Sequence, residues 1–224
     1  MILYNTVIIV NIALLYYNKN MEETTTLEKI HKIATEEFLQ NGFRGASLRE
    51  IVKKAGVTTG AFYGYYKSKE ELFDAIVQPH AEYIRNCFDN CIKDFLSVPK
   101  EEWSQHMSDF SENGMATMFD YAFEHKDSFR LILNASEGTK WENYIHDLVE
   151  TEIEITHKYY DVIREQGFKP HSLPPMLEHM IISGEFTGLF EVIIHDIPKE
   201  EAMLCVKELH DFYEAAWAKM LGLE

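Results

Sequence analysis

Residues 47–72 read SLREIVKKAGVTTGAFYGYYKSKEEL, and their pattern predicts two short helices joined by a tight turn, followed by the start of a third helix. Ser47 can cap the first helix by accepting a backbone N–H. Apolar residues then recur at helical spacing, at Leu48, Ile51, Val52 and Ala55. Gly56 supplies the left-handed backbone that ends a helix, and Thr58 caps the second helix, which runs to about Tyr66. This is the layout of a helix-turn-helix, a motif that places its second helix in the major groove of DNA.

Basic residues concentrate around this motif, although the whole chain is acidic. The net charge of −16 argues by itself against nonspecific binding to polyanions. Between residues 39 and 69, however, only Glu50 opposes six basic residues, which are Arg44, Arg49, Lys53, Lys54, Lys67 and Lys69. A basic face on an acidic body can bind phosphates while the remainder repels DNA and orients the docking.

The composition favours an all-helical fold. Of the 224 residues, 46% are apolar, which is enough for a substantial core, and alternating β-branched runs are nearly absent. A long helix is predicted to begin at Ser68, with a kink or a break near Pro79. Further helices are expected over residues 101–124, 127–135, 141–166, 174–195 and 199–221. The three cysteines are too few for a disulfide framework and suit a reducing cytoplasm.

The stretch from Leu27 to Leu72 resembles the N-terminal domain of the TetR (tetracycline-repressor) family of bacterial transcription regulators. The matching residues keep a fixed register and are Gly42, Phe43, Arg49, Ala55, Gly56, Val57, Gly60, Tyr63, Ser68, Lys69 and Glu70. Thr59 and Gly64 depart from the commonest pattern, because both are shorter than the usual side chains, so operator sequences of the family are not carried over. The resemblance implies an all-α chain with a three-helix helix-turn-helix domain over residues 21–67. A larger helical domain for effector binding and dimerisation would follow over residues 68–224.

The resemblance also implies which residues contact DNA. Base or near-base contacts are expected from Arg49, Thr58, Thr59, Ala61 and Tyr65. Phosphate contacts are expected from Ser47, Tyr63, Lys67 and Lys69. The implied partners are double-stranded operator DNA, a second copy of the chain and an unidentified small-molecule effector. Neither a cofactor nor a membrane is expected. The protein would be a cytoplasmic regulator, a repressor that its effector releases from DNA.

The last two predicted helices carry the features of a dimerisation unit. Ser183, Gly184, Thr187 and Gly188 are small residues at near-helical spacing, where a helix of the partner subunit could approach closely. Phe212, Tyr213 and Trp217 would supply area to bury. The alternative is that these residues pack within one subunit.

Large, adaptable apolar side chains between residues 83 and 180 are candidates for an effector pocket. They are Tyr83, Cys87, Trp103, Met107, Phe110, Met115, Met118, Phe119, Phe129, Trp141 and Tyr144. Taken singly, each of them is equally typical of an ordinary core, and only the resemblance implies a cavity somewhere in this set. The excess of acidic residues hints at a cationic ligand, although most carboxylates are expected on the surface.

An all-helical enzyme or metal-binding bundle that carries a helix-turn-helix is the alternative function. The pair Glu154 and His157 has the spacing of a carboxylate-bridged di-metal site, but such a site needs a second copy and two further glutamates. Cys87 and Cys91 could form a redox pair, yet they lie on an apolar stripe, where thiols are usually inert. No pattern of a catalytic triad or phosphate-binding loop stands out in the sequence.

Residues 1–20, MILYNTVIIVNIALLYYNKN, form an apolar extension. Their apolar run is shorter than the roughly 20 residues of a membrane-spanning helix, and they lack the features of a signal peptide. We expect translation to start at Met21. Residues 1–20 would then result from an upstream start codon that was assigned in error. An accessory helix and a membrane anchor are the alternatives.

Overall fold

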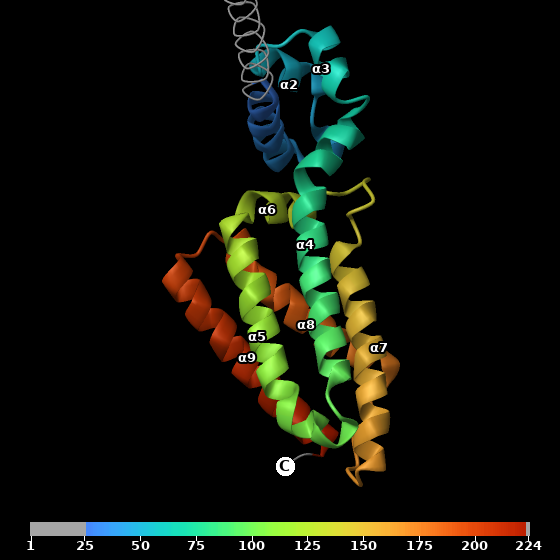
Figure 1. Ribbon diagram of the computed structural model, residues 1–224. Coiled ribbons are helices and arrows are strands. Elements are labelled where there is room, and N and C mark those ends of the chain that lie inside the picture. The colour runs from blue at the N-terminus through green and yellow to red at the C-terminus, as the bar shows by residue number, and fades with distance from the viewer. Residues whose placement is uncertain (1–25, 223–224) are drawn as a thin grey trace, which may run out of the picture. The chain divides into compact units, whose positions relative to one another are not determined.

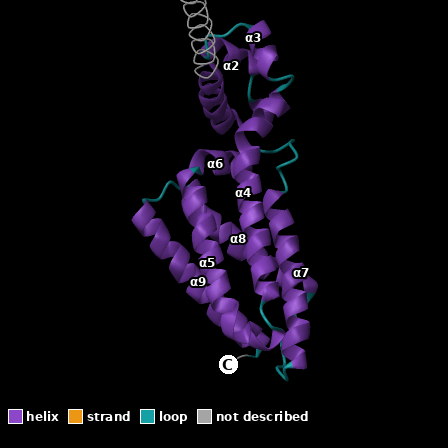
Figure 2. Ribbon diagram, in the orientation of Figure 1, coloured by secondary structure: helices purple, strands orange, loops and turns teal. Residues whose placement is uncertain are grey.

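The computed structural model describes residues 26–222, apart from the side chains of residues 104, 105 and 107–111. The expectations for residues 1–20 therefore lie outside the described residues. Every regular element in the described part is helical, as the sequence predicted (Figure 2). The chain divides into two compact units between Ile76 and Val77, nine residues beyond the start of the predicted second domain.

The first unit contains the predicted helix-turn-helix. A helix over residues 26–45 is followed by α2 (Leu48–Lys54), α3 (Thr59–Tyr65) and the beginning of α4 (Lys69–Ser97) (Figure 1). Its core is aromatic, because the ring of Phe73 meets the rings of Phe38 and Phe43 edge-on at 5.0 and 5.3 Å between centroids. These ring contacts pack α4 against the helix over residues 26–45.

Both short helices begin and end as the sequence predicted. The Ser47 hydroxyl accepts the backbone N–H of Glu50 at 3.4 Å, and the Thr58 hydroxyl accepts that of Ala61 at 3.1 Å. Gly56 has φ +68°, the left-handed conformation that a side chain would strain. Together these local interactions determine where α2 stops and where α3 starts.

The second unit is a helical bundle built around α8. It contains most of α4, then η1 (Lys100–Glu102), α5 (Trp103–Glu124), α6 (Lys126–Asn134), α7 (Tyr144–Glu165), α8 (Pro175–Ile194) and α9 (Lys199–Leu221). α8 packs against α5, α6, α7 and α9. The α4 helix is continuous through Pro79, so the helix does not break at this residue.

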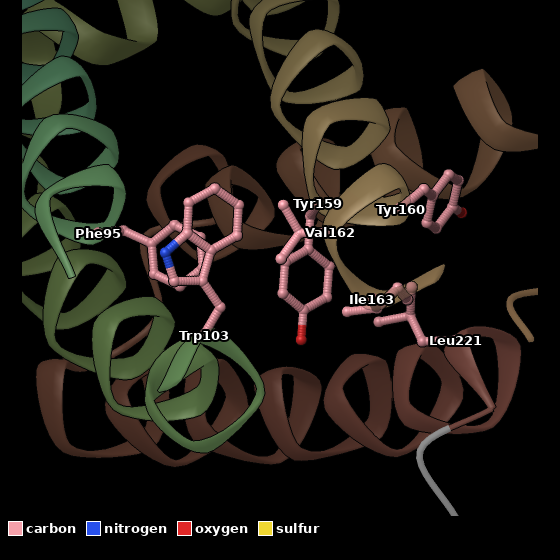
Figure 3. Close-up of a cluster of buried hydrophobic side chains, with 7 residues drawn as sticks. All are labelled: Phe95, Trp103, Tyr159, Tyr160, Val162, Ile163 and Leu221. Carbon is pink, nitrogen blue, oxygen red and sulfur yellow. The ribbon is translucent and has the colours of Figure 1, made fainter. Parts of the chain in front are cut away.

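An aromatic and aliphatic cluster closes one end of this bundle (Figure 3). Its members are Phe95, Trp103, Tyr159, Tyr160, Val162, Ile163 and Leu221. The indole of Trp103 stacks on the Tyr159 ring with centroids 6.2 Å apart, and its N–H donates to the carbonyl oxygen of Val98 at 2.9 Å. Trp103, a candidate for the effector pocket, is therefore a core residue whose only polar atom has a partner within the chain.

The glycines of α8 allow α9 of the same chain to approach closely. A Cβ atom at Gly188 would lie 2.9 Å from Leu209 Cδ2, and one at Gly184 would lie 3.0 Å from the Tyr213 hydroxyl. Trp217 donates a hydrogen bond to Glu185 at 3.3 Å. These contacts join α8 to α9 of the same chain. The role of the two glycines in contacting a helix of the partner subunit stays a prediction.

Other apolar side chains of α8 and α9 lie on the surface. Their exposed fractions are 69% for Met176, 61% for Met180, 51% for Met203, 58% for Leu204 and 66% for Phe212. Exposed side chains of this size on two neighbouring helices are typical of a protein interface. We call these five residues the apolar surface of α8 and α9.

Candidate functional site

The outer face of α3 is the part of the helix-turn-helix that can meet a ligand. Phe62 is fully buried and Tyr66 is only 8% exposed, so this side of the motif packs into the unit. The exposed residues at and after the cap are Thr58, Thr59, Gly60, Ala61, Tyr63 and Gly64. A Cβ atom at Gly64 would meet no heavy atom within 4 Å. The backbone of α3 can therefore approach another molecule closely at this face.

The residues predicted to contact DNA differ in their surroundings. Those with exposed side chains are Arg49, Thr58, Thr59, Ala61, Tyr63 and Lys67. Ser47 and Tyr65 are half-buried. The Lys69 ammonium is engaged within the unit, because it donates to the carbonyl oxygens of Phe43 at 2.6 Å and Ala46 at 3.0 Å. A phosphate contact by Lys69 would have to replace these hydrogen bonds.

The buried residue Glu37 binds both ends of α2 and so supports the helix-turn-helix, a role that the sequence did not indicate. Its carboxylate is 5% exposed and lies 2.8 Å from the Lys54 ammonium. It also accepts the backbone N–H of Ser47 at 3.3 Å and the side-chain amide of Asn41 at 3.1 Å. The hydrogen bond from Lys54 is the main reason that the pKa of Glu37 lies below its usual value. Lys54 thus belongs to the support of α2.

A partly open cavity of about 150 Å³ lies in the second unit. Four helices line it: α4 with Phe88 and Cys91, α5 with Met115 and Met118, α7 with Glu152, and α8 with Glu185 and Phe186. A smaller cavity of about 40 Å³ shares Met115, Met118, Phe186 and Leu189 with it and extends to Phe119 and Phe190. Of the predicted pocket residues, Met115, Met118 and Phe119 line these two cavities.

The two carboxylates in the larger cavity have raised pKa values. Burial is the main cause for both, and it raises the pKa of Glu152 to about 7 with a further contribution from the charge of Glu185. Neither glutamate was singled out in the sequence. A signal was present, because Glu152 occupies a position between Leu148 and Ile155 that the helical period assigns to the apolar side of α7.

The other predicted pocket residues lie elsewhere. Phe129 is fully buried and stacks on Phe190 at 6.0 Å, and the Tyr144 hydroxyl donates to the carbonyl oxygen of Ala81 at 3.0 Å. Tyr83 is 40% exposed and stacks on Tyr121. Trp141 and Cys87 are half-buried and are not among the residues that line the cavities described above. The side chains of Met107 and Phe110 lie outside the described residues.

Residues 30–76 match the family model of the bacterial regulatory proteins of the tetR family. This match covers the helix over residues 26–45, the two capped helices and the first residues of α4. The helix-turn-helix unit of the chain therefore belongs to the tetR family.

Curated helix-turn-helix regulators match the chain over different lengths. The regulator YdgC of Bacillus subtilis is 25% identical over 166 residues, which are 72% of this chain and 82% of YdgC. The transcriptional repressor NemR of Escherichia coli is 42% identical over 65 residues, which are 28% of this chain and 31% of NemR. YerO of Bacillus subtilis is 27% identical over 106 residues, and this chain spans 34% of its length. The likeness to NemR and YerO thus covers about a third of each relative.

Solved structures of tetR-family proteins share the fold. A TetR-like regulator from Rhodococcus sp. RHA1 superposes with a TM-score of 0.54 and 14% identity, covering 88% of this chain and 96% of the other. PfmR from Thermus thermophilus gives a TM-score of 0.51 and 17% identity, covering 87% and 98%. The coverage extends well beyond the helix-turn-helix, so the second unit of the chain also has the helical fold of these proteins.

One surface cluster of the second unit has donor atoms that could hold a metal ion. His146, Glu150 and His179 each bring one such atom within 4.8 Å of the others. The predicted pair of Glu154 and His157 is arranged differently, because His157 Nε2 lies 2.7 Å from Glu178 Oε2 on α8. Within residues 26–222, no helix has the length and apolar character that crossing a membrane requires.

Proposed function

We propose that this transcriptional regulator of the tetR family is a cytoplasmic repressor that binds operator DNA as a homodimer and leaves it when a small molecule occupies the second unit. The observation that carries the DNA-binding part is the exposed face of α3, which is capped by Thr58 and anchored by Phe62. No observation of the described residues favours the alternative of an all-helical enzyme.

The geometry of α3 supports major-groove reading. Thr59 and Ala61 are exposed on the first turn of the helix, where recognition helices contact base edges. Arg49 and Lys67 are exposed on either side of α3 in the sequence and would contact phosphates or nearby bases. A homodimer would place two copies of α3 in successive major grooves, about 34 Å apart.

The α4 helix supports the proposed release mechanism. Its residues Phe88, Cys91 and Ile92 line the larger cavity, while its first turns, up to Ile76, belong to the unit that contains α3. A ligand among the cavity side chains would therefore act directly on the helix that continues into the DNA-binding unit. Such a ligand favours the conformation in which the cavity is filled. If the two α3 helices of the dimer are spaced differently in that conformation, the population shifts away from the form that binds DNA. Pro79, where one helical hydrogen bond is missing, is a candidate hinge.

The DNA contacts can be tested on a labelled fragment from upstream of the protein's own gene. Thr59→Ala should change the sequence preference, by about 1–3 kcal/mol at particular base pairs, because this side chain faces the groove. Lys67→Ala should weaken specific and nonspecific sites alike and lower the slope of log affinity against log salt by about one.

Lys93→Ala is the matched control, because Lys93 is exposed on α4 in the second unit. It should leave both the affinity and the salt slope unchanged. Equal weakening of all sequences by Thr59→Ala would remove Thr59 from the base contacts. Absence of any sequence-specific binding by the unaltered protein would contradict the function itself.

A further inference from the structure

The cavity lined by Glu152 and Glu185 in the second unit combines an apolar wall with two carboxylates. Glu152 reaches it from α7 and Glu185 from α8. The remaining lining residues are apolar side chains together with Cys91 and Gly114. Glu152 and Glu185 are half-buried, and carboxylates are rarely placed among apolar side chains without a cation or several hydrogen bonds, because removing the charge from water is costly.

The groups that face these carboxylates compensate little of their charge. On Glu152 the named influences besides burial are the charge of Glu185 and a hydrogen bond from Thr156. On Glu185 they are a hydrogen bond from the indole N–H of Trp217 and an electrostatic contribution from His210, and both residues lie on α9.

The walls formed by α4 and α5 add no positive charge. From α4, Cys91 contributes a thiol whose pKa burial raises further, so it stays neutral. From α5 the lining consists of Gly114, Met115 and Met118. The cavity is thus an apolar space with a local excess of negative charge.

We propose that the effector of this regulator is a small organic cation, a one-ring or similarly sized ammonium compound, bound with its charge beside Glu152 and Glu185 and its apolar body among the phenylalanine and methionine side chains. That this ligand acts as an effector rests on the proposed function, whereas its binding does not.

The size of the cavity limits the ligand. A dry apolar cavity of about 150 Å³ accommodates benzene, whereas pockets for drug-sized molecules measure about 300–1,000 Å³. The volume of about 150 Å³, with about 40 Å³ more in the adjoining cavity, therefore fits a single ring with a short substituent. The rings of Phe88 and Phe186 meet edge-on in the wall at 5.7 Å, and their faces can add cation–π attraction.

In the absence of a cation, the Glu152 carboxyl can hold a proton. Because the pKa of Glu152 is raised to about 7, this carboxyl is partly protonated near neutral pH. A permanently charged ligand must displace that proton. Its affinity should therefore fall about tenfold for each pH unit below about 7 and level off above it, with proton release on binding.

A pair of isosteric probes separates charge from shape. Phenyltrimethylammonium and tert-butylbenzene have nearly the same size, but only the first is charged. Calorimetry should show that the full-length protein binds the cation at least about tenfold more tightly than the hydrocarbon at pH 8, as expected for a charge close to two carboxylates in a medium of reduced dielectric constant. Equal affinities for both probes, or no binding of the cation, would overturn the proposal.

Two variants locate the charge effect. Glu152→Gln keeps the shape of the side chain, and it should weaken phenyltrimethylammonium about tenfold or more, remove its pH dependence and leave tert-butylbenzene unchanged. Glu154→Gln is the matched control, because Glu154 lies on the same helix but is exposed, and it should change neither affinity. If Glu152→Gln is poorly folded by circular dichroism, Glu185→Gln serves as the second variant. An unchanged cation affinity in a folded variant contradicts the assignment.

The operator assay separates this inference from the proposed function. Release of DNA by phenyltrimethylammonium in the unaltered protein, and not in Glu152→Gln, supports both. Tight, Glu152-dependent binding without release supports the cation site and contradicts release through this cavity. Release by tert-butylbenzene but not by the cation supports a ligand-released repressor and overturns the cationic class.

Discussion

Glu37 is the single residue on which the helix-turn-helix most depends. Its buried carboxylate binds the Lys54 ammonium at 2.8 Å and the backbone of Ser47 at 3.3 Å. It therefore ties the helix over residues 26–45 to both ends of α2. Lys54 is 48% exposed, so solvent screens part of the attraction, and most of the stabilisation comes from the hydrogen bonds to the buried carboxylate.

We predict that Glu37→Gln destabilises the first unit by about 1–2 kcal/mol at neutral pH, because the amide replaces a charged acceptor opposite Lys54. The pKa of Glu37 is lower in the folded than in the unfolded chain. Its contribution is therefore complete above the unfolded pKa of about 4.5 and is lost as the pH falls through the folded pKa. Amide hydrogen exchange in peptides from residues 26–76, corrected for intrinsic rates at each pH, measures both effects.

Glu36→Gln is the control for this prediction, since Glu36 is the exposed neighbour of Glu37. It should leave protection in the first unit close to that of the unaltered protein. If both variants lose the same protection at neutral pH, the ion pair with Lys54 does not support the motif.

At the scale of helices, the contact of α8 with α9 depends on a glycine of α8, because no side chain there keeps the two helices apart. Gly188 leaves space that Leu209 fills, with a Cβ position only 2.9 Å from Leu209 Cδ2. Gly188→Leu should therefore overpack this contact and lower the free energy of unfolding by about 1–3 kcal/mol. Leu209→Ala in the same chain should relieve part of the loss, so that the double variant is more stable than the sum of the single effects predicts.

Urea unfolding followed by circular dichroism measures this coupling. Gly64→Leu is the control, because Gly64 lies in a helix with no neighbour within 4 Å of a Cβ, and it should not lower the stability. A Gly188→Leu variant with unchanged subunit stability that becomes monomeric would instead place Gly188 at the boundary between subunits.

For the whole molecule, the apolar surface of α8 and α9 is the surface on which we expect a second copy to pack. Phe212 is 66% exposed in a single chain, and burying it on association would stabilise a dimer. Phe212→Glu would place a charge there whose burial costs several kcal/mol. We therefore predict a monomer with its helical signal retained and much weaker operator binding, because one copy contacts only half of a two-fold site.

Light scattering, circular dichroism and the operator assay together test this prediction. Leu96→Glu is the matched control, since Leu96 is 38% exposed on α4, outside α8 and α9. This variant should remain dimeric. A Phe212→Glu protein that also stays dimeric would show that the subunits associate through another surface.

The sequence by itself determined the features that depend on neighbours along the chain. Ser47 and Thr58 cap their helices, and Gly56 takes the left-handed conformation, because each of these roles needs only a few adjacent residues. The helical periods predicted the positions of α5 to α9 for the same reason. The all-α fold and the helix-turn-helix followed from these local preferences.

The tertiary structure alone decided which side chains meet. Glu152 and Glu185 belong to different helices, and a helical period shows that each faces inward without showing that both reach one cavity. Gly188 is equally suited to a helix of its own chain or of a partner, and only the packed structure shows that Leu209 of its own chain lies against it. The physical reason is the same in both cases: contacts between helices depend on how several helices pack at once, and this packing is not encoded in any one segment of the sequence.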